Sequence, residues 1–382
     1  MNIVKRMIYV IIVSCIFAYR HLRNIFRARP AKMAKKTRPF KWYKVPLGKE
    51  CVSSDGSKYV MYVNKGTSDN LLIYFSGGGI AWDPMAVHNP MGLKSFLRGK
   101  GIGFYFSRLP VFGSHPMKGA LQNNNRDNPF YGWNIAYIPY TTGDFHIGNK
   151  TAEIEYEGKT KKMHFNGLVN AKKALEKTYS IFKSAKNVFV CGESAGAFGS
   201  AFYLNEIASK YPDSSMYYLS DNAHLRYDQW DKTADFWGTD AKEEFGFSLG
   251  GDIVKASFIN SSKALGAGIT LLHANTLRDA VLTRIYANMN GISTETTDYI
   301  DMWSRQMTEC TKDLSEAIPN YYYYITNNEY DAKTHMTPHV ISRHDRFYKY
   351  KQDDVFFYKW IGDILDGKKY SVGEKYIKQQ MK

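Results

Sequence analysis

The chain has 382 residues, of which 44% are apolar and 23% are charged, and this length and balance fit a globular protein of one large domain or two ordinary ones. The formal net charge is +15, but residues 1–45 hold twelve Lys or Arg and no acid, so the remainder contributes 15 − 12 = +3. Because no basic stripe interleaved with aromatic residues follows residue 45, the composition argues against a protein that binds nucleic acid.

The N-terminal segment carries a short apolar run between basic residues. Residues 7–19 are 13 consecutive mostly apolar residues, fewer than the roughly 20 that a membrane-spanning helix needs. The run fits the core of a signal peptide, which is about 7–15 residues long. No clear small-x-small cleavage site follows, although residues 12–15 (IVSC) resemble a lipoprotein cleavage box. The alternative is an uncleaved short anchor whose flanking arginines reach the headgroups.

The charges around this run leave its orientation open. Ten basic residues lie between Arg20 and Lys44, against two before the run, so the positive-inside rule places the main domain in the cytoplasm. Export would place that domain outside. The same basic stretch attracts an anionic lipid surface by charge alone. We therefore expect a membrane-associated or secreted protein of the cell envelope, with the membrane surface as a partner of this segment.

Beyond the basic segment, strand and helix patterns alternate along the chain. Short apolar runs predict strands at 58–63, 70–75, 133–140, 187–191, 215–220, 269–274 and 320–326. Helical spacing of apolar residues predicts helices at 166–183, 195–210 and 279–289. This alternation indicates an α/β fold with a mostly parallel sheet and helices on both faces. We divide the chain into residues 1–45 (signal or anchor segment and basic linker), 46–370 (catalytic domain) and 371–382 (polar tail).

The four cysteines indicate neither a metal ribbon nor a disulfide framework. Cys15, Cys51, Cys191 and Cys310 are far apart and form no CxxC pair. We expect most of them to be buried free thiols.

One motif points to nucleophilic catalysis. Residues 192–196 (GESAG) form a GxSxG pattern between the apolar run 187–191 and a helix start rich in small residues. A nucleophile elbow needs this context, because the chain turns sharply from strand to helix and lifts the serine, here Ser194, to the helix N-terminus. A structural serine in a Gly-rich turn is the alternative.

A second glycine cluster fits an oxyanion loop. Ser76, Gly77, Gly78 and Gly79 follow the predicted strand 70–75 directly. Esterases and lipases use such a loop, with the N–H of the residue after the nucleophile, here Ala195, to bind the developing oxyanion. Neither GxGxxG nor GK[ST] is present, so a nucleotide site is disfavoured.

A serine nucleophile needs a base, and the base needs an orienting carboxylate. Asp279 follows the predicted strand 269–274 at a helix start, although an acid there also complements the helix dipole. His335, His339 and His344 cluster after the last predicted strand and are all possible bases. His335 and His339 are spaced like zinc ligands, but neither HExxH nor a third ligand pattern accompanies them.

Four blocks together resemble the pectin acetylesterase and Notum-like carboxylesterase family. They are CVSSDGSKY (51–59), LLIYFSGGGIAWD (71–83), NPFYGWNIAYIPYTTGDFHIGN (128–149) and CGESAGAFGS (191–200). The resemblance implies an α/β-hydrolase fold and the removal of acyl groups, often acetyl from pectin, from hydroxyls. It also implies roles for individual residues: Ser194 as nucleophile, Gly78, Gly79 and Ala195 as oxyanion donors, and Asp279 as the acid. HVISRHDRFY (339–348) resembles the family's histidine block and favours His339 as the base, whereas aligning THMT (334–337) instead makes it His335.

The chain departs from the resemblance at two places. Bacterial members often carry a cysteine where Ala81 stands, and another where Thr141 and Thr142 stand. A disulfide that braces this loop in relatives is therefore not expected here, so the pocket and its substrate stay open.

We therefore expect a serine esterase that acts without a metal or organic cofactor on an ester substrate, with acetylated carbohydrate as one candidate. Trp82 and Trp133 are candidate walls of its pocket, and a monomer is expected. Two alternatives stay open: a catalytically inactive, membrane-tethered binding protein of the same fold, and a lipase or peptidase on the same scaffold.

Overall fold

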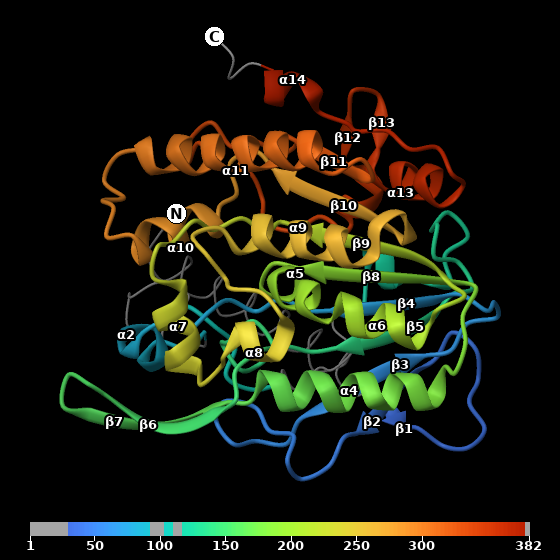
Figure 1. The fold of residues 1–382 in the computed structure, drawn as a ribbon, viewed down its shortest axis with the longest axis horizontal. Coiled ribbons are helices and arrows are strands. Elements are labelled where there is room, and N and C mark those ends of the chain that lie inside the picture. Colours follow the sequence, from blue (N-terminus) through green and yellow to red (C-terminus); the bar gives the residue numbers. More distant parts are fainter. Residues whose placement is uncertain (1–29, 92–102, 110–116, 379–382) are drawn as a thin grey trace, which may run out of the picture.

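The computed structural model describes residues 30–91, 103–109 and 117–378 (Figure 1). Their largest element is a nine-stranded sheet. In spatial order its strands are β1 (Ala31–Lys32), β2 (Trp42–Pro46), β3 (Val60–Asn64), β5 (Asn134–Ile138), β4 (Leu71–Phe75), β8 (Asn187–Glu193), β9 (Ser215–Asp221), β10 (Ile269–Thr276) and β11 (Tyr321–Thr326). The six strands from β5 to β11 in this order are parallel to one another, and β3 runs against them. The predicted mostly parallel sheet is confirmed.

Side chains of each strand alternate between two apolar cores. In β4, Leu71, Ile73 and Phe75 belong to one core, and Leu72 and Tyr74 belong to the other. Since successive side chains of a strand point to opposite faces, a continuous apolar run fits a strand that is covered on both sides.

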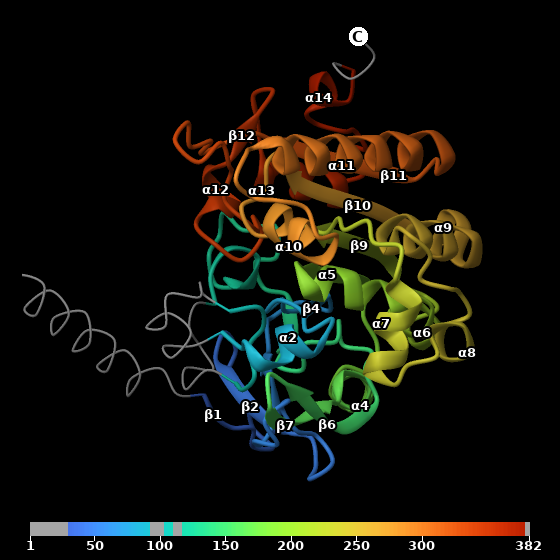
Figure 2. The same ribbon diagram turned by 90° about the vertical axis from the view of Figure 1, so that its left-hand side faces the viewer.

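Helices cover both faces of the sheet, as Figure 2 shows from the side. The first core includes side chains of α4 (Gly167–Ile181), α6 (Leu204–Lys210), α9 (Ile253–Leu265) and α11 (Asp298–Ala317). The second includes side chains of η1 (Gly119–Leu121), α12 (Arg346–Lys349) and α13 (Phe357–Leu365). The prediction of helices on both faces is therefore confirmed.

The remaining elements are helices, 3-10 turns and two two-stranded sheets. They are α2 (Pro84–His88), α5 (Ala195–Ser200), η2 (Ala201–Tyr203), α7 (Trp230–Trp237), α8 (Ala241–Phe245), η3 (Gly266–Gly268), α10 (Leu282–Met289), α14 (Glu374–Lys378) and the paired strands β6 (Lys150–Tyr156) with β7 (Lys159–Phe165) and β12 (Lys351–Gln352) with β13 (Val355–Phe356). The β6–β7 hairpin projects from the body in Figure 1. Its strands are rich in Lys and Glu, so no apolar run in the sequence predicts them.

The strand order reverses at β4, which pairs with β5 on one side and with β8 on the other. Ligand sites of open parallel sheets form at such a reversal, beyond the carboxyl ends of the strands. The glycine loop after β4 and the serine turn after β8 both leave the sheet at this edge.

Strands and contacts of the fold extend beyond residues 46–370 at both ends. β1 and the start of β2 lie within residues 1–45, the segment expected to end in a linker. β1 pairs with β2, and the main chain of residues 42–46 pairs with β3. The expected polar tail from residue 371 also enters the fold: Val372 pairs with Tyr324, and Ile377 packs into the first core.

The predicted N-terminal apolar run at 7–19 lies outside the described residues. Among residues 30–91, 103–109 and 117–378, no helix is both long enough and apolar enough to cross a membrane. Cys51, Cys191 and Cys310 are buried free thiols, as expected, and Cys15 lies outside the described residues.

Candidate active site

Ser194 stands at a strained turn between β8 and α5. Its φ of 50° and ψ of −125° place a non-glycine residue in a left-handed region, which costs on the order of 1–3 kcal/mol. The flanking glycines are required by contact, since a Cβ on Gly192 would lie 2.4 Å from the Gly196 oxygen, and one on Gly196 would lie 2.1 Å from the Phe75 oxygen. The strand and helix therefore hold Ser194 at the edge of the sheet, with 7% of its surface exposed.

The glycine loop after β4 lies against this turn. A Cβ on Gly77 would stand 2.7 Å from the Ser194 Cβ. The Gly77 N–H donates to the Glu193 carboxylate over 3.4 Å. By contrast, the N–H groups of Gly78, Gly79 and Ala195 donate none of the hydrogen bonds found within the described part of the chain. These are the three N–H groups that the sequence assigns to the oxyanion.

Asp279 is buried and holds an imidazole. Its Oδ2 accepts a 2.6 Å hydrogen bond from His339 Nδ1 and another from the Asn222 amide, also 2.6 Å. Its Oδ1 accepts from the N–H groups of Val281 and Leu282, each over 2.8 Å. Burial by itself raises the pKa of Asp279, but the His339 charge and these hydrogen bonds outweigh burial and lower it. The carboxylate therefore stays ionised.

His339 is half-buried, with 16% of its side chain exposed. Because its Nδ1 is bonded to Asp279, its Nε2 is the nitrogen left to act as a base. Burial alone lowers the pKa of His339, yet the Asp279 charge and hydrogen bond raise it above its ordinary value. Between the two described residues Ser194 and His339 no hydrogen bond is formed, and such contacts are often long without substrate.

His335 points elsewhere. It is exposed, its φ is 58°, and its Nδ1 lies 2.9 Å from the Tyr330 hydroxyl. The structure thus brings His339, and not His335, to Asp279. It also gives the two histidines separate partners, so they do not converge as zinc ligands would.

Two further acids fix the histidine loop beside Ser194, and the sequence patterns do not single them out. The Asp221 carboxylate, at the end of β9, accepts from the Ile341 N–H over 3.0 Å and from the Ser342 N–H over 2.7 Å. Glu193, next to Ser194, pairs with Arg343 Nη1 over 2.5 Å. These contacts attach residues 341–343 to the strand ends on either side of the serine turn.

The Glu193 carboxylate also joins the loops to the sheet. Its second oxygen accepts from the Tyr74 hydroxyl over 3.1 Å, and that hydroxyl lies 2.9 Å from Ser342 Oγ. One buried carboxylate therefore contacts the glycine loop, the sheet and the histidine loop. In the sequence, Glu193 is marked only by its position: it is the variable residue of the GxSxG pattern directly before Ser194.

The two tryptophans predicted to line the pocket lie at different edges of the sheet. Trp82 follows the glycine loop and packs edge-on against Phe104, with ring centroids 4.9 Å apart. Trp133 precedes β5 and packs edge-on against Phe130 in the second core. The amino end of β5 is opposite the edge that carries Ser194, so the structure does not bring Trp133 to this site. Trp133 packs in the second core.

We expect kcat/KM for ester hydrolysis to fall as the pH drops through the pKa of His339, because only the neutral imidazole accepts a proton. Because the pKa of His339 is raised, the midpoint of this acid limb of the pH profile lies at a pH above the ordinary pKa of histidine. Asp221 contributes in the same direction. Burial raises its pKa to about 6, and its protonation removes the charge that holds residues 341 and 342.

The substitution Asp221→Asn should move this acid limb to lower pH. The Asp221 charge helps to raise the pKa of His339, so its removal favours the neutral imidazole. The pH profile of kcat/KM measures the shift, with Asp228→Asn at an exposed position as the matched control. An unchanged limb in Asp221→Asn would show that this carboxylate does not act on His339.

The fold and this edge of the sheet define the class of the protein: it is an α/β-hydrolase. The chain belongs to the pectinacetylesterase family, whose model matches residues 34–224, and it is therefore a carboxylic ester hydrolase. The match contains Ser194 and the glycine loop and ends before Asp279 and His339.

A comparison with solved structures agrees with the fold. The crystal structure of the Wnt deacylase Notum from Drosophila is similar with a TM-score of 0.61 and 14% sequence identity, over 87% of this chain and 95% of that chain. At this identity the likeness concerns the fold alone. A search of curated proteins found no match.

Proposed function

We propose that this protein is a serine esterase that removes acyl groups, acetyl above all, from the hydroxyls of a carbohydrate-like substrate through Ser194, His339 and Asp279. The observation that carries the proposal is the 2.6 Å hydrogen bond between Asp279 and His339, on a loop attached to both sides of the Ser194 turn. Three neighbouring backbone N–H groups complete the arrangement.

The reaction follows in two steps from this geometry. His339 Nε2 takes the Ser194 proton while Oγ attacks the ester carbonyl, and Asp279 stabilises the imidazolium that forms. The N–H groups of Gly78, Gly79 and Ala195 bind the tetrahedral oxyanion. The alcohol leaves with the proton from His339, and water then hydrolyses the acyl-serine by the same route in reverse. Removal of one oxyanion donor typically costs about 100- to 1000-fold in kcat.

Aromatic side chains beside the oxyanion donors favour a short acyl group. A Cβ on Gly78 would stand 2.8 Å from a Phe106 ring carbon and 3.0 Å from a Tyr140 ring carbon. These two rings therefore flank the place where the carbonyl would bind. Trp82, which packs on Phe104 in the same segment, is a further proposed wall of the pocket.

A substrate panel tests the proposal. We expect kcat/KM for p-nitrophenyl esters to fall by about 10-fold or more from acetate to octanoate, and acetate to be released from acetylated pectin or xylan. A fluorophosphonate should label the protein at one residue per chain. Absence of both hydrolysis and labelling would favour the inactive binding protein. Activation at lipid interfaces would favour a lipase, and amide cleavage a peptidase.

We also propose that residues 1–45 hold the enzyme at a membrane surface. Twelve basic residues without an acid support this, since each such charge near an anionic surface contributes about 1 kcal/mol.

A further inference from the structure

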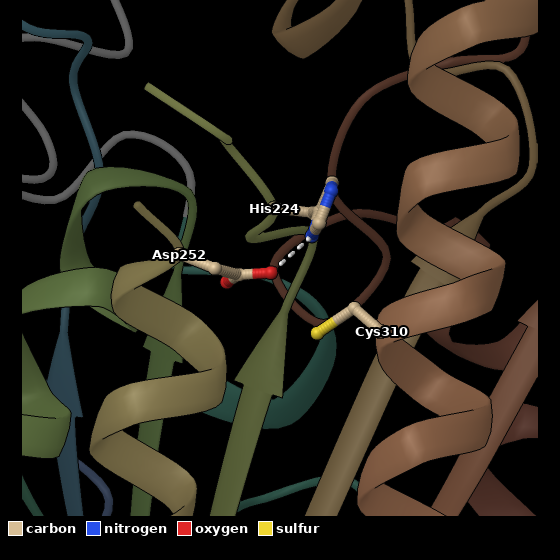
Figure 3. Close-up of side chains that lie close together, drawn as sticks. All are labelled: His224, Asp252 and Cys310. Carbon is tan, nitrogen blue, oxygen red and sulfur yellow. Dashed lines mark ion pairs between the residues drawn. The ribbon is translucent and has the colours of Figure 1, made fainter. Parts of the chain in front are cut away.

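A second cluster of reactive side chains lies close to the carboxyl end of β9. His224 follows β9, Asp252 caps the N-terminus of α9, and Cys310 lies in α11. Figure 3 shows the three side chains pointing toward one another from three separate elements. One ligand atom from each lies within 4.8 Å of the other two.

His224 is buried, and its ring nitrogens find no hydrogen-bond partner among the described residues. Its exposure is 0%, and within the described part of the chain neither ring nitrogen forms a hydrogen bond. The backbone around it is well held, since Trp303 Nε1 donates to the His224 carbonyl over 2.8 Å and the Trp303 indole packs on the ring. A buried polar group left unpaired costs about 1–3 kcal/mol, so a fixed imidazole with two free nitrogens indicates a missing ligand.

Asp252 directs one carboxylate oxygen at the same imidazole. Its Oδ1 accepts from the Lys255 N–H over 3.1 Å and so caps α9. Its Oδ2 is buried and lies 3.9 Å from His224 Nδ1, and the carboxylate also interacts with the Cys310 thiol. The cap fixes the carboxylate, which leaves Oδ2 directed at the imidazole.

We propose that His224, Asp252 and Cys310 bind a divalent transition metal of the Zn²⁺ type. Imidazole nitrogen, carboxylate oxygen and thiolate sulfur are the ligands that Zn²⁺ prefers. A thiolate and a carboxylate also balance its charge of two, and the thiol proton leaves to solvent as the sulfur–metal bond forms. A water molecule would complete the tetrahedron.

The distances permit this with small adjustments. Bonds of about 2.0–2.3 Å in a tetrahedron place neighbouring ligand atoms about 3.4–3.6 Å apart. The 3.9 Å between His224 Nδ1 and Asp252 Oδ2 exceeds this by a few tenths of an ångström, and the cluster's limit of 4.8 Å exceeds it by little more than 1 Å. Small shifts of the three side chains would close both differences.

Arg226 is the competing cation at this cluster. Its Nε lies 3.7 Å from Asp252 Oδ2, and its Nη1 lies 3.5 Å from Glu309 Oε2. Without metal, Arg226 offsets the Asp252 charge. With metal bound, the Arg226 guanidinium can keep its contacts with Glu309 and with solvent, because its side chain is 36% exposed. Removing this positive charge should therefore tighten metal binding.

The site has a structural consequence for the acid. Asn222, whose amide holds Asp279, is two residues before His224. A metal that joins His224 to α9 and α11 would fix this segment against both helices. The metal would thus position Asn222, and through it Asp279, without contacting the substrate.

The test uses the full-length protein, prepared with a reductant and without chelators. We expect one equivalent of zinc by elemental analysis, and one equivalent of Co²⁺ bound to the metal-free protein with thiolate-to-cobalt charge-transfer absorption. Cys310→Ser should lose this absorption, whereas the control C15S/C51S should keep it. Arg226→Gln should bind Co²⁺ about 10-fold more tightly, which equals about 1.4 kcal/mol.

Wild-type protein that binds no metal, or that binds Co²⁺ without thiolate absorption, would overturn the proposal. Should Cys310→Ser not fold, His224→Gln provides the second variant, and its retention of full Co²⁺ affinity would equally overturn it. Fluorophosphonate labelling of the same samples reports Ser194 independently. Failure of the metal site and failure of the esterase proposal are therefore distinguishable.

Discussion

Replacement of Ser194 by alanine is expected to reduce kcat for p-nitrophenyl acetate by about 10⁴- to 10⁶-fold, to the rate left by the oxyanion donors and substrate binding alone. Alanine keeps the Cβ and removes only Oγ. The turn is built by Gly192 and Gly196 and by the backbone of β8, so its shape does not depend on the hydroxyl. Loss of activity would therefore report the missing nucleophile and not a changed fold.

Two measurements make this result specific. The midpoint of thermal unfolding should stay close to that of wild type, and fluorophosphonate labelling should disappear. Ser180→Ala, at an exposed position of α4, should keep both activity and labelling. Unchanged turnover in Ser194→Ala would remove the esterase mechanism altogether, whatever the geometry of the histidine.

Ser194 and the glycine loop could be predicted because short local sequence determines their structure. An apolar strand, two glycines around a serine and a small-residue helix start specify the turn within about fifteen residues, and the glycine loop follows its own strand directly. The strands themselves are apolar runs bounded by polar residues. The observed β4 (Leu71–Phe75) and β8 (Asn187–Glu193) match the predicted runs within a few residues.

The base could not be settled from the sequence because its partner is distant. Asp279 and His339 are 60 residues apart, and their contact depends on the loop that Asp221 and Glu193 attach to the sheet. Those two acids are ordinary residues of strand ends in the sequence. Only the pairing of Glu193 with Asp221 in neighbouring strands places them together.

Other features were missed for different reasons. The helix α11 carries an amphipathic stripe of Ile300, Trp303, Met307 and Leu314, so its signal was present in the sequence. The predicted single helix at 195–210 is instead α5, a 3-10 turn and α6. The cluster of His224, Asp252 and Cys310 has no ligand spacing at all, because its members come from three elements that meet only in the fold.

The comparison of His339→Ala with His335→Ala should separate the two candidate bases. His339→Ala is expected to lower kcat by about 10⁴- to 10⁶-fold, because Ser194 loses its proton acceptor and Asp279 is left without the imidazole it orients. His335→Ala is expected to change kcat by less than about 2-fold, since its ring contacts the Tyr330 hydroxyl at the surface. Steady-state kinetics with p-nitrophenyl acetate measure both.

The same pair of variants tests the role assigned to Asp279. Its Oδ2 keeps the Asn222 amide and its Oδ1 keeps two backbone donors when His339 is absent, so the carboxylate stays satisfied and the variant should fold. Added imidazole should then restore part of the activity of His339→Ala, because a small base can enter the space beside Ser194, and it should leave His335→Ala unaffected. Loss of activity in His335→Ala with retention in His339→Ala would instead move the base to the exposed end of the loop and would require that end to reach Ser194.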